Sequence, residues 1–396
     1  MPHVDKFSSL TKIFHWLTAG LILMIIPLGV LANRAPFETS EQLAQKAWLF
    51  SMHKTLGVAV FFVALLRILW AMTQAKPGPL HPDRKAETLL ADIIHWVLYI
   101  SLVAVPLTGW IEHAATSGFA PIWWPFGQSL PFIPQSESLA GVFAGLHWMF
   151  GKLMVASILL HIAGALKHHF IDKDATLRRM WFGASNAPET LPHARKAAAP
   201  IMAVLAFGGA AAAAYNLGFL ERHGETIAAA ALEDVASEWT VTEGALSITI
   251  TQFGSKVSGS FAEWTSDISF DPEPADVMGT VETVISIGSL TLGSVTADAM
   301  GPDYFDVEMH PTAVFTADIM PDGNAYVAEG TLTIKDASVP VSLPFVLDLN
   351  GDTAQMAGSL SINRMDFGVG ATQTDEGSLG FNVDIMVNLT ATKAAE

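Results

Sequence analysis

The sequence predicts a protein of two parts, an all-α transmembrane bundle followed by an all-β antiparallel barrel. Five apolar stretches before residue 220 each approach the roughly 20 residues that a membrane-spanning helix needs. From about residue 238 apolar and polar residues alternate, which is typical of half-buried strands. Charge divides in the same way, with 17 Lys and Arg against 12 Asp and Glu in 1–222, and 4 against 26 in 223–396. The two parts are therefore expected to occupy different environments.

The apolar stretches predict four bundle helices and a fifth that tethers the second part, at about 13–32, 51–72, 89–111, 141–166 and 197–219. Positive charge concentrates in segments 73–88 and 167–196, so the positive-inside rule places both in the cytoplasm. The N-terminus is then cytoplasmic and the second part lies outside. The Ala-rich fifth stretch also resembles an internal signal sequence, and cleavage near residue 230 stays an alternative to a retained helix.

Two of these stretches contain a proline followed closely by a glycine, Pro27 with Gly29 and Pro106 with Gly109. Neighbouring helices can satisfy the carbonyl groups that a proline leaves unpaired within a membrane. Both positions are therefore interpreted as tolerated kinks without a chemical role.

The second part reads as a meander of about eight strands in one barrel. Leu246, Ile248 and Ile250 alternate with polar residues, and segments 339–349 and 381–389 repeat the pattern. Turn sequences such as Pro321-Asp322-Gly323-Asn324 separate these runs. The predicted domains are the four-helix part, the fifth helix with its linker, and the barrel, at 1–190, 191–235 and 236–396.

Four histidines lie inside or at the ends of the apolar stretches, at His15, His53, His147 and His161. An ionisable side chain in hydrocarbon is costly, so its presence there indicates a partner such as a metal. His147 and His161 are fourteen residues apart, which places them on one helix face about 21 Å apart. That distance is too long for one metal ion and suits two.

Helix direction predicts how these histidines pair. His53 and His147 fall near the outer ends of their helices, and His15 and His161 fall near the inner ends. Two bis-histidine sites suit six-coordinate b-type haems, whereas zinc needs more ligands at each depth. The absence of cysteine excludes covalently attached haem and iron–sulfur clusters. The alternative is that some of these histidines only pack between helices.

Other charged residues in the first part are weaker candidates. His95 is expected to contact a haem propionate or a quinone oxygen, or to pack within the bundle, with neither interpretation preferred. Lys152 either extends toward the membrane surface or meets a propionate, and the propionate is favoured. Arg67 is interpreted as extending to the surface. His168-His169 and Arg178-Arg179 are interpreted as a basic end that faces lipid headgroups rather than as propionate or quinone contacts.

The first part resembles the bacterial cytochrome b561 family over about residues 5–182. The resemblance rests on Phe14-His15-Trp16, Met52-His53-Lys54, His95-Trp96-Val97-Leu98-Tyr99 with Pro106 and Gly109, and the run from Leu160 to His169. It implies a four-helix di-haem cytochrome of the bacterial inner membrane, whose haem-ligand pattern falls on His15, His53, His147 and His161. Some members are quinone-linked oxidoreductases that oxidise superoxide at the periplasmic face and reduce ubiquinone.

The second part resembles the YceI-like family of periplasmic lipocalin-like proteins over about residues 238–394. The resemblance rests on Val257–Phe261, Phe305-Asp306, His310–Phe315, Gly330–Lys335 and Asn363–Gly368. It implies an eight-stranded barrel whose apolar bore holds a polyisoprenoid chain such as a quinone tail. The expected lining residues are Phe315, Leu332, Phe345 and Phe381. A small barrel can instead be filled by its own side chains.

These observations predict a membrane-bound b-type cytochrome that exchanges electrons between the quinone pool and a periplasmic donor or acceptor, superoxide included. Its cofactors are two haem b groups and ubiquinone or a related isoprenoid quinone, and the barrel binds a quinone-like lipid. No nucleic acid partner is expected, and no catalytic residue is identified. Two alternatives remain, a pure electron carrier for a dehydrogenase partner and an isoprenoid-binding or sensing protein with structural haems.

Overall fold

The computed structural model describes residues 6–182, 188, 190, 197–220, 229–233, 235, 237–273 and 275–394. Its backbone divides into two compact units, which are taken one at a time below. The helical unit comprises Met1–Arg34, Trp48–Thr116 and Pro121–Arg222, and the β unit comprises Ala35–Ala47, Ser117–Ala120 and His223–Glu396.

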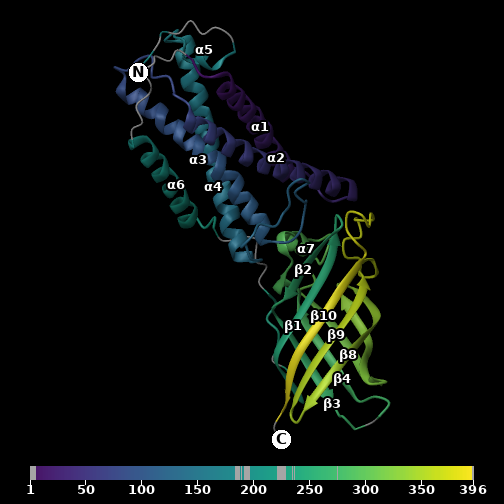
Figure 1. The fold of residues 1–396 in the computed structure, drawn as a ribbon. Helices are drawn as coiled ribbons and strands as arrows, with labels where there is room; N and C mark the ends of the chain where they lie inside the picture. Colours follow the sequence, from purple (N-terminus) through teal and green to yellow (C-terminus); the bar gives the residue numbers. More distant parts are fainter. Residues whose placement is uncertain are drawn as a thin grey trace. The chain divides into compact units, whose positions relative to one another are not determined.

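All five predicted spans are confirmed as helices, and the described residues form a sixth, short helix between the fourth and fifth spans (Figure 1). These helices are α1 (Ser9–Arg34), α2 (Ser40–Thr73), α3 (Lys85–Ala115), α4 (Glu137–Phe170), α5 (Thr176–Met180) and α6 (Ala198–Asn216), and a further short helix, α7 (Thr296–Met300), lies in the β unit. Large apolar side chains stay exposed on their outer faces, as for Leu66 at 57% and Leu205 at 61%. Such faces are unfavourable in water and suit hydrocarbon, so this is a multi-pass membrane protein.

The fifth spanning helix, α6, does more than tether the second part. Ala203 and Phe207 of α6 are buried against Val97 of α3, and the Phe207 ring lies 4.9 Å from the Phe150 ring of α4. Small residues along α6 let its backbone approach its neighbours closely. The helix α6 therefore packs as a member of the bundle, beyond the tethering role expected for it.

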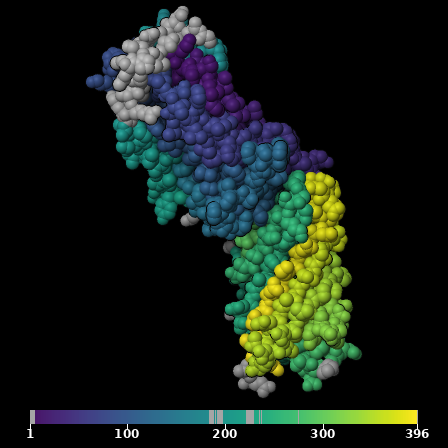
Figure 2. Space-filling model, in the orientation of Figure 1, coloured from purple at the N-terminus to yellow at the C-terminus, as the bar shows by residue number. Residues whose placement is uncertain are grey.

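The β unit is one curled antiparallel sheet of ten strands, in the order β3-β4-β6-β7-β8-β9-β10-β1-β2-β5 (Figure 1). Its strands are β1 (Trp239–Gln252), β2 (Ser255–Phe261), β3 (Trp264–Phe270), β4 (Gly279–Ser286), β5 (Leu290–Thr291), β6 (Thr312–Asp322), β7 (Ala325–Ile334), β8 (Ala337–Asn350), β9 (Thr353–Asn363) and β10 (Asn382–Lys393). In the space-filling view β8 to β10 lie side by side in lime green and yellow (Figure 2).

The antiparallel fold is confirmed, although the sheet has ten strands where eight were expected. The strand is interrupted between Phe261 and Trp264. As a result, β2 pairs with β1, whereas β3 pairs with β4. The two-residue strand β5 then adds to β2. Side chains bridge the space between β3 and the start of β1, because Trp239 Nε1 donates to the Phe270 carbonyl at 3.1 Å.

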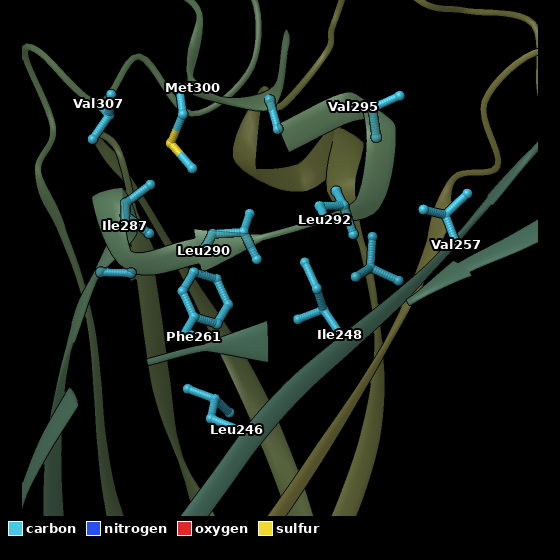
Figure 3. Packing of buried hydrophobic residues seen from close by; sticks show 13 residues of the cluster. Leu246, Ile248, Val257, Phe261, Ile287, Leu290, Leu292, Val295, Met300 and Val307 are labelled. Atoms are coloured by element: carbon cyan, nitrogen blue, oxygen red, sulfur yellow. The ribbon is translucent and has the colours of Figure 1, made fainter. Parts of the chain in front are cut away.

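The strand alternation produces two apolar clusters inside the β unit. One is formed by Leu246, Ile248 and Phe261 beneath the segment from Ile287 to Val295 (Figure 3). The other is formed by residues from β1, β3 and β6 to β10, including Trp239 and Phe345. Every second residue points inward in a strand, and this places these side chains in the interior.

Candidate functional site

The structure brings the four histidines together in the two expected pairs. His53 of α2 and His147 of α4 form the outer pair, with ring centres 6.3 Å apart. His15 of α1 and His161 of α4 form the inner pair, with ring centres 6.1 Å apart. Because a metal–imidazole bond is about 2 Å long, two imidazoles on opposite sides of one ion have ring centres about 6 Å apart. The spacing of both pairs therefore fits one iron between each.

His53 of the outer pair is oriented by α1. Its Nδ1 donates a hydrogen bond to the Ile25 carbonyl oxygen at 2.9 Å, which leaves Nε2 for a metal. Gly29 lies one helical turn after Ile25, and a Cβ atom at Gly29 would lie 2.7 Å from His53 Cε1. A side chain at this glycine would occupy the space of the imidazole ring.

The same arrangement recurs between α3 and α4. His147 Nδ1 donates to the Val105 carbonyl oxygen at 2.8 Å, and a Cβ atom at Gly109 would lie 2.8 Å from His147 Nδ1. The interpretation of Gly29 and Gly109 as parts of kinks without a chemical role is therefore wrong. Each glycine makes room for one ring of the outer pair. The sequence held no signal for this role, because the accepting carbonyl groups of Ile25 and Val105 are identified only by the structure.

The inner pair has a different neighbour. Arg67 Nη2 lies 3.4 Å from His15 Nδ1, and the Arg67 guanidinium lies 5.4 Å from the centre of the Tyr99 ring. The guanidinium thus turns toward the bundle interior, contrary to the expectation that it extends to the membrane surface. Arginine keeps its positive charge under all ordinary conditions. The inner site therefore has a fixed cation, whereas the outer histidines have carbonyl acceptors.

His95 of α3 lies next to the inner pair without fitting as a ligand. Its ring centre is 5.0 Å from that of His161, closer than the roughly 6 Å of two imidazoles on one ion. The 6.1 Å spacing of His15 and His161 thus suits one shared ion better than the 5.0 Å spacing of His95 and His161. A contact of His95 with a propionate or quinone stays a prediction.

Two lysines lie near the outer pair. Lys152 Nζ is 5.1 Å from the centre of the Trp148 ring, and its expected propionate contact stays a prediction. Lys54 follows His53 directly and is only 8% exposed, with Nζ 5.9 Å from the Phe50 ring centre. The sequence analysis did not single out Lys54 as a site residue. The available signal was its position directly after a predicted ligand.

The β unit contains an apolar cavity. The cavity has a volume of about 150 Å³, and Ser266 and Thr283 are the polar residues in its lining. Phe315, Leu332 and Phe345 line it as expected. Phe381 does not, because it precedes β10 and packs against the Arg364 guanidinium, 5.4 Å from its ring centre. Such a lining suits an apolar ligand.

Comparison with known proteins identifies the helical part. The family model described as prokaryotic cytochrome b561 matches residues 6–183. The probable superoxide oxidase CybB of Yersinia pestis is 31% identical over 177 residues, which cover 44% of this chain and 95% of that protein. The chain belongs to the cytochrome b561 family. Cytochrome b561 homolog 2 of Escherichia coli (strain K12) is 29% identical over 182 residues, or 44% of this chain and 91% of that protein.

A second family model, the YceI-like domain, matches residues 239–391 of this cytochrome. BcnA of Burkholderia cenocepacia shares 31% identity over 38% of this chain and 96% of its own, with a TM-score of 0.36. The YCEI protein of Campylobacter jejuni shares 16% identity over 43% of this chain and 96% of its own, with a TM-score of 0.31. Both resemblances are confirmed, and the chain fuses a cytochrome b561 part to a YceI-like domain. The first family implies haem b and an oxidoreductase type of activity.

Substitution of Gly29 by valine is expected to remove the outer haem from this cytochrome. The new side chain would take the space of the His53 ring, and valine is a better helix former than glycine, so helix weakening cannot explain the loss. Pyridine-haemochrome analysis measures the haem content. Gly20→Val in the same helix is the control, because a Cβ atom at Gly20 meets nothing within 4 Å. Full haem content in Gly29→Val would contradict the assigned role.

Substitution of Arg67 by glutamine is expected to lower the reduction potential of the inner haem by some tens of millivolts. A cation stabilises the electron-rich ferrous state, and a unit charge roughly 10 Å away contributes about 1–2 kcal/mol at an effective dielectric constant of about 20. A spectroscopic redox titration measures the potential of a haem held at the inner pair. Arg67→Lys keeps the charge and should keep the potential; an equal fall in both variants would assign the effect to geometry.

Proposed function

We propose that this protein is a di-haem b-type cytochrome of the bacterial inner membrane that transfers electrons between a periplasmic donor and the quinone pool. The observation that carries the proposal is the presence of two histidine pairs at two levels of α4. The outer pair would hold one haem and the inner pair the other. Haem bound there would supply one-electron transfer, with both imidazoles of each pair holding it.

The charge distribution supports the proposed orientation. Segments 73–88 and 167–196 hold most of the Lys and Arg of the helical part, and the positive-inside rule places them in the cytoplasm. The outer pair then faces the periplasm, and the YceI-like domain lies in the periplasm. The proposed domain boundaries are those expected from the sequence, 1–190, 191–235 and 236–396.

The proposed reaction is oxidation of superoxide coupled to reduction of ubiquinone. Two superoxide ions give up one electron each and become two molecules of oxygen. Ubiquinone takes both electrons and two protons and becomes ubiquinol. The name of the Yersinia pestis relative, probable superoxide oxidase, supports superoxide as the donor.

Stopped-flow spectroscopy tests the reaction on the haem-loaded full chain. Superoxide is expected to reduce the haems faster than it reduces free haem, and added ubiquinone is expected to reoxidise them. A rate no faster than that of free haem would favour the alternative of a pure electron carrier for a dehydrogenase partner. Failure of quinol and quinone to exchange electrons with the haems would instead favour a lipid-binding or sensing protein with structural haems.

We propose that the cavity of the β unit binds the polyisoprenoid chain of a quinone-like lipid. An apolar chain in this lining loses contact with water at a gain of about 25 cal/mol per Å². Phe315, Leu332 and Phe345 are the proposed contacts among the residues expected from the sequence.

Substitution of Ala328 by phenylalanine is expected to reduce the lipid that copurifies with the protein. Ala328 is buried in the cavity wall, and the larger ring would fill space that the lipid needs. Mass spectrometry of organic extracts measures the bound lipid. Ala357→Phe is the control, because Ala357 is exposed and lies outside this lining. Equal lipid in both variants, or no isoprenoid lipid in the unsubstituted protein, would contradict the proposal.

A further inference from the structure

A second cluster of histidines and carboxylates lies away from the haem ligands, where the segment before α3 meets the end of α4. His81 Nε2 lies 3.2 Å from Asp174 Oδ2, and His168 Nδ1 lies 2.7 Å from the same oxygen. The two imidazole rings stack, with centres 6.3 Å apart and planes 8° from parallel. One ligand atom from each residue lies within 4.8 Å of the other two.

Neighbouring carboxylates are already neutralised by permanent cations. Asp172 Oδ2 pairs with Lys167 Nζ at 2.9 Å and Asp172 Oδ1 with Arg84 Nη1 at 3.0 Å. Hydrogen bonds from Lys167 and then Arg84 lower the pKa of Asp172 to about 2. Glu87 also pairs with Lys167 and with Arg84. A metal ion would therefore gain little electrostatic stabilisation from Asp172 and Glu87.

Asp174 differs from both of them. Its ion pairs in the described part of the chain are those with His81 and His168, which are charged only when protonated. Its side chain is only 10% exposed. A carboxylate that is largely removed from water, and that pairs with no Lys or Arg among the described residues, gains from a metal ion as its counter-charge.

The cluster is also held in place by the surrounding backbone. Asp174 Oδ1 accepts a hydrogen bond from the Thr176 amide at 2.8 Å. The segment that carries His81 is anchored where Arg179 Nη1 donates to the Gly78 carbonyl at 2.8 Å. A site whose ligands are positioned before binding loses less entropy when the ion arrives.

We propose that His81 Nε2, His168 Nδ1 and Asp174 Oδ2 form a site for a divalent transition-metal ion of the zinc class, with water as the remaining ligand. Imidazole nitrogen and carboxylate oxygen are ligands that Zn²⁺ accepts, at about 2.0–2.2 Å. Ligand atoms around such an ion lie about 3 Å apart, close to the two distances given above. The ion would tie the segment before α3 to the end of α4, apart from the haem ligands.

Equilibrium dialysis against ZnCl₂ with elemental analysis tests the site on the haem-loaded, untagged full chain after chelator treatment. One tightly held Zn²⁺ per chain is expected, and His81→Gln and Asp174→Asn should each weaken binding by at least about tenfold. The control is His169→Gln, which changes the adjacent exposed histidine of the same helix and should bind as the unsubstituted protein does. Unchanged haem spectra verify that each variant is folded.

Thermal unfolding of the helical unit gives a second readout. Zn²⁺ should raise the unfolding temperature of the unsubstituted protein and of His169→Gln, because an ion that binds only the folded state stabilises it. The rise should be lost in His81→Gln and Asp174→Asn. Absence of stoichiometric Zn²⁺, or binding that these two substitutions leave unchanged, overturns the proposal and leaves the cluster as histidine–aspartate hydrogen bonds.

Discussion

Substitution of His161 by alanine is expected to remove the inner haem and to leave the outer one, so that haem content falls from two per chain to one. His53→Ala should do the reverse. Each histidine pair would lose one of its two imidazoles, and a haem without covalent attachment would depend on both. Pyridine-haemochrome analysis counts the haems, and a redox titration with optical spectra shows which one remains. Either loss should also stop electron transfer between the two membrane faces.

The pairing makes a sharper prediction than the haem count. His15→Ala should remove the same haem as His161→Ala, whereas His95→Ala should keep both haems, because its ring lies too close to His161 to share an ion. If His15→Ala retains both haems and His95→Ala loses one, the inner ligand is His95 of α3 rather than His15 of α1. Two haems in every variant would refute the pairs altogether.

Much of the fold could be predicted because it depends on local patterns. A run of about 20 apolar residues has few alternatives to a spanning helix, and strict alternation indicates a strand. The packing of α6 could not be read in this way. Alanine and glycine in a membrane helix suit a lipid-facing tether and a close helix contact equally well. The interruption of the strand between Phe261 and Trp264 could not be predicted either, because the partners of β2 and β3 are strands from other parts of the sequence.

The histidine pairs could be predicted because helix direction and a fourteen-residue spacing determine depth in a membrane. The roles of Gly29, Gly109 and Arg67 could not, since each depends on which side chain of another helix lies opposite. Periodicity reports the face of one helix and carries no information about the rotation of its neighbour. The same limit applies to Phe381, whose alternation continues that of β10 although its side chain meets Arg364.

Substitution of Arg364 is expected to have the second large effect, which is a loss of stability of the β unit. Arg364 is 4% exposed. Its guanidinium donates hydrogen bonds to five backbone carbonyl groups and to the Met365 sulfur. The carbonyl groups are those of Val369, Gly370, Gln373, Leu379 and Gly380. One side chain thus organises the whole loop between β9 and β10.

Arg364→Met is therefore expected to destabilise the β unit by about 3 kcal/mol or more. Methionine fills much of the volume but donates no hydrogen bond, and each buried carbonyl left unpaired costs about 1–3 kcal/mol. With a denaturant dependence of about 2 kcal/mol per molar urea, the midpoint should fall by roughly 1.5 M. Proteolysis of the full chain is measured across a urea series. Identification of the fragments by mass then reports unfolding of the β unit separately from that of the helices.

Lys256→Met is the matched control for this loss. Lys256 is a cation of the same unit, but its side chain is 74% exposed and its ion pair with Asp384 spans 3.9 Å. An exposed pair contributes about 0–1 kcal/mol, so the midpoint should scarcely move. If Arg364→Met shifts the midpoint no more than this control, water must replace the guanidinium at the carbonyl groups. The loop between β9 and β10 would then keep its shape without a central donor.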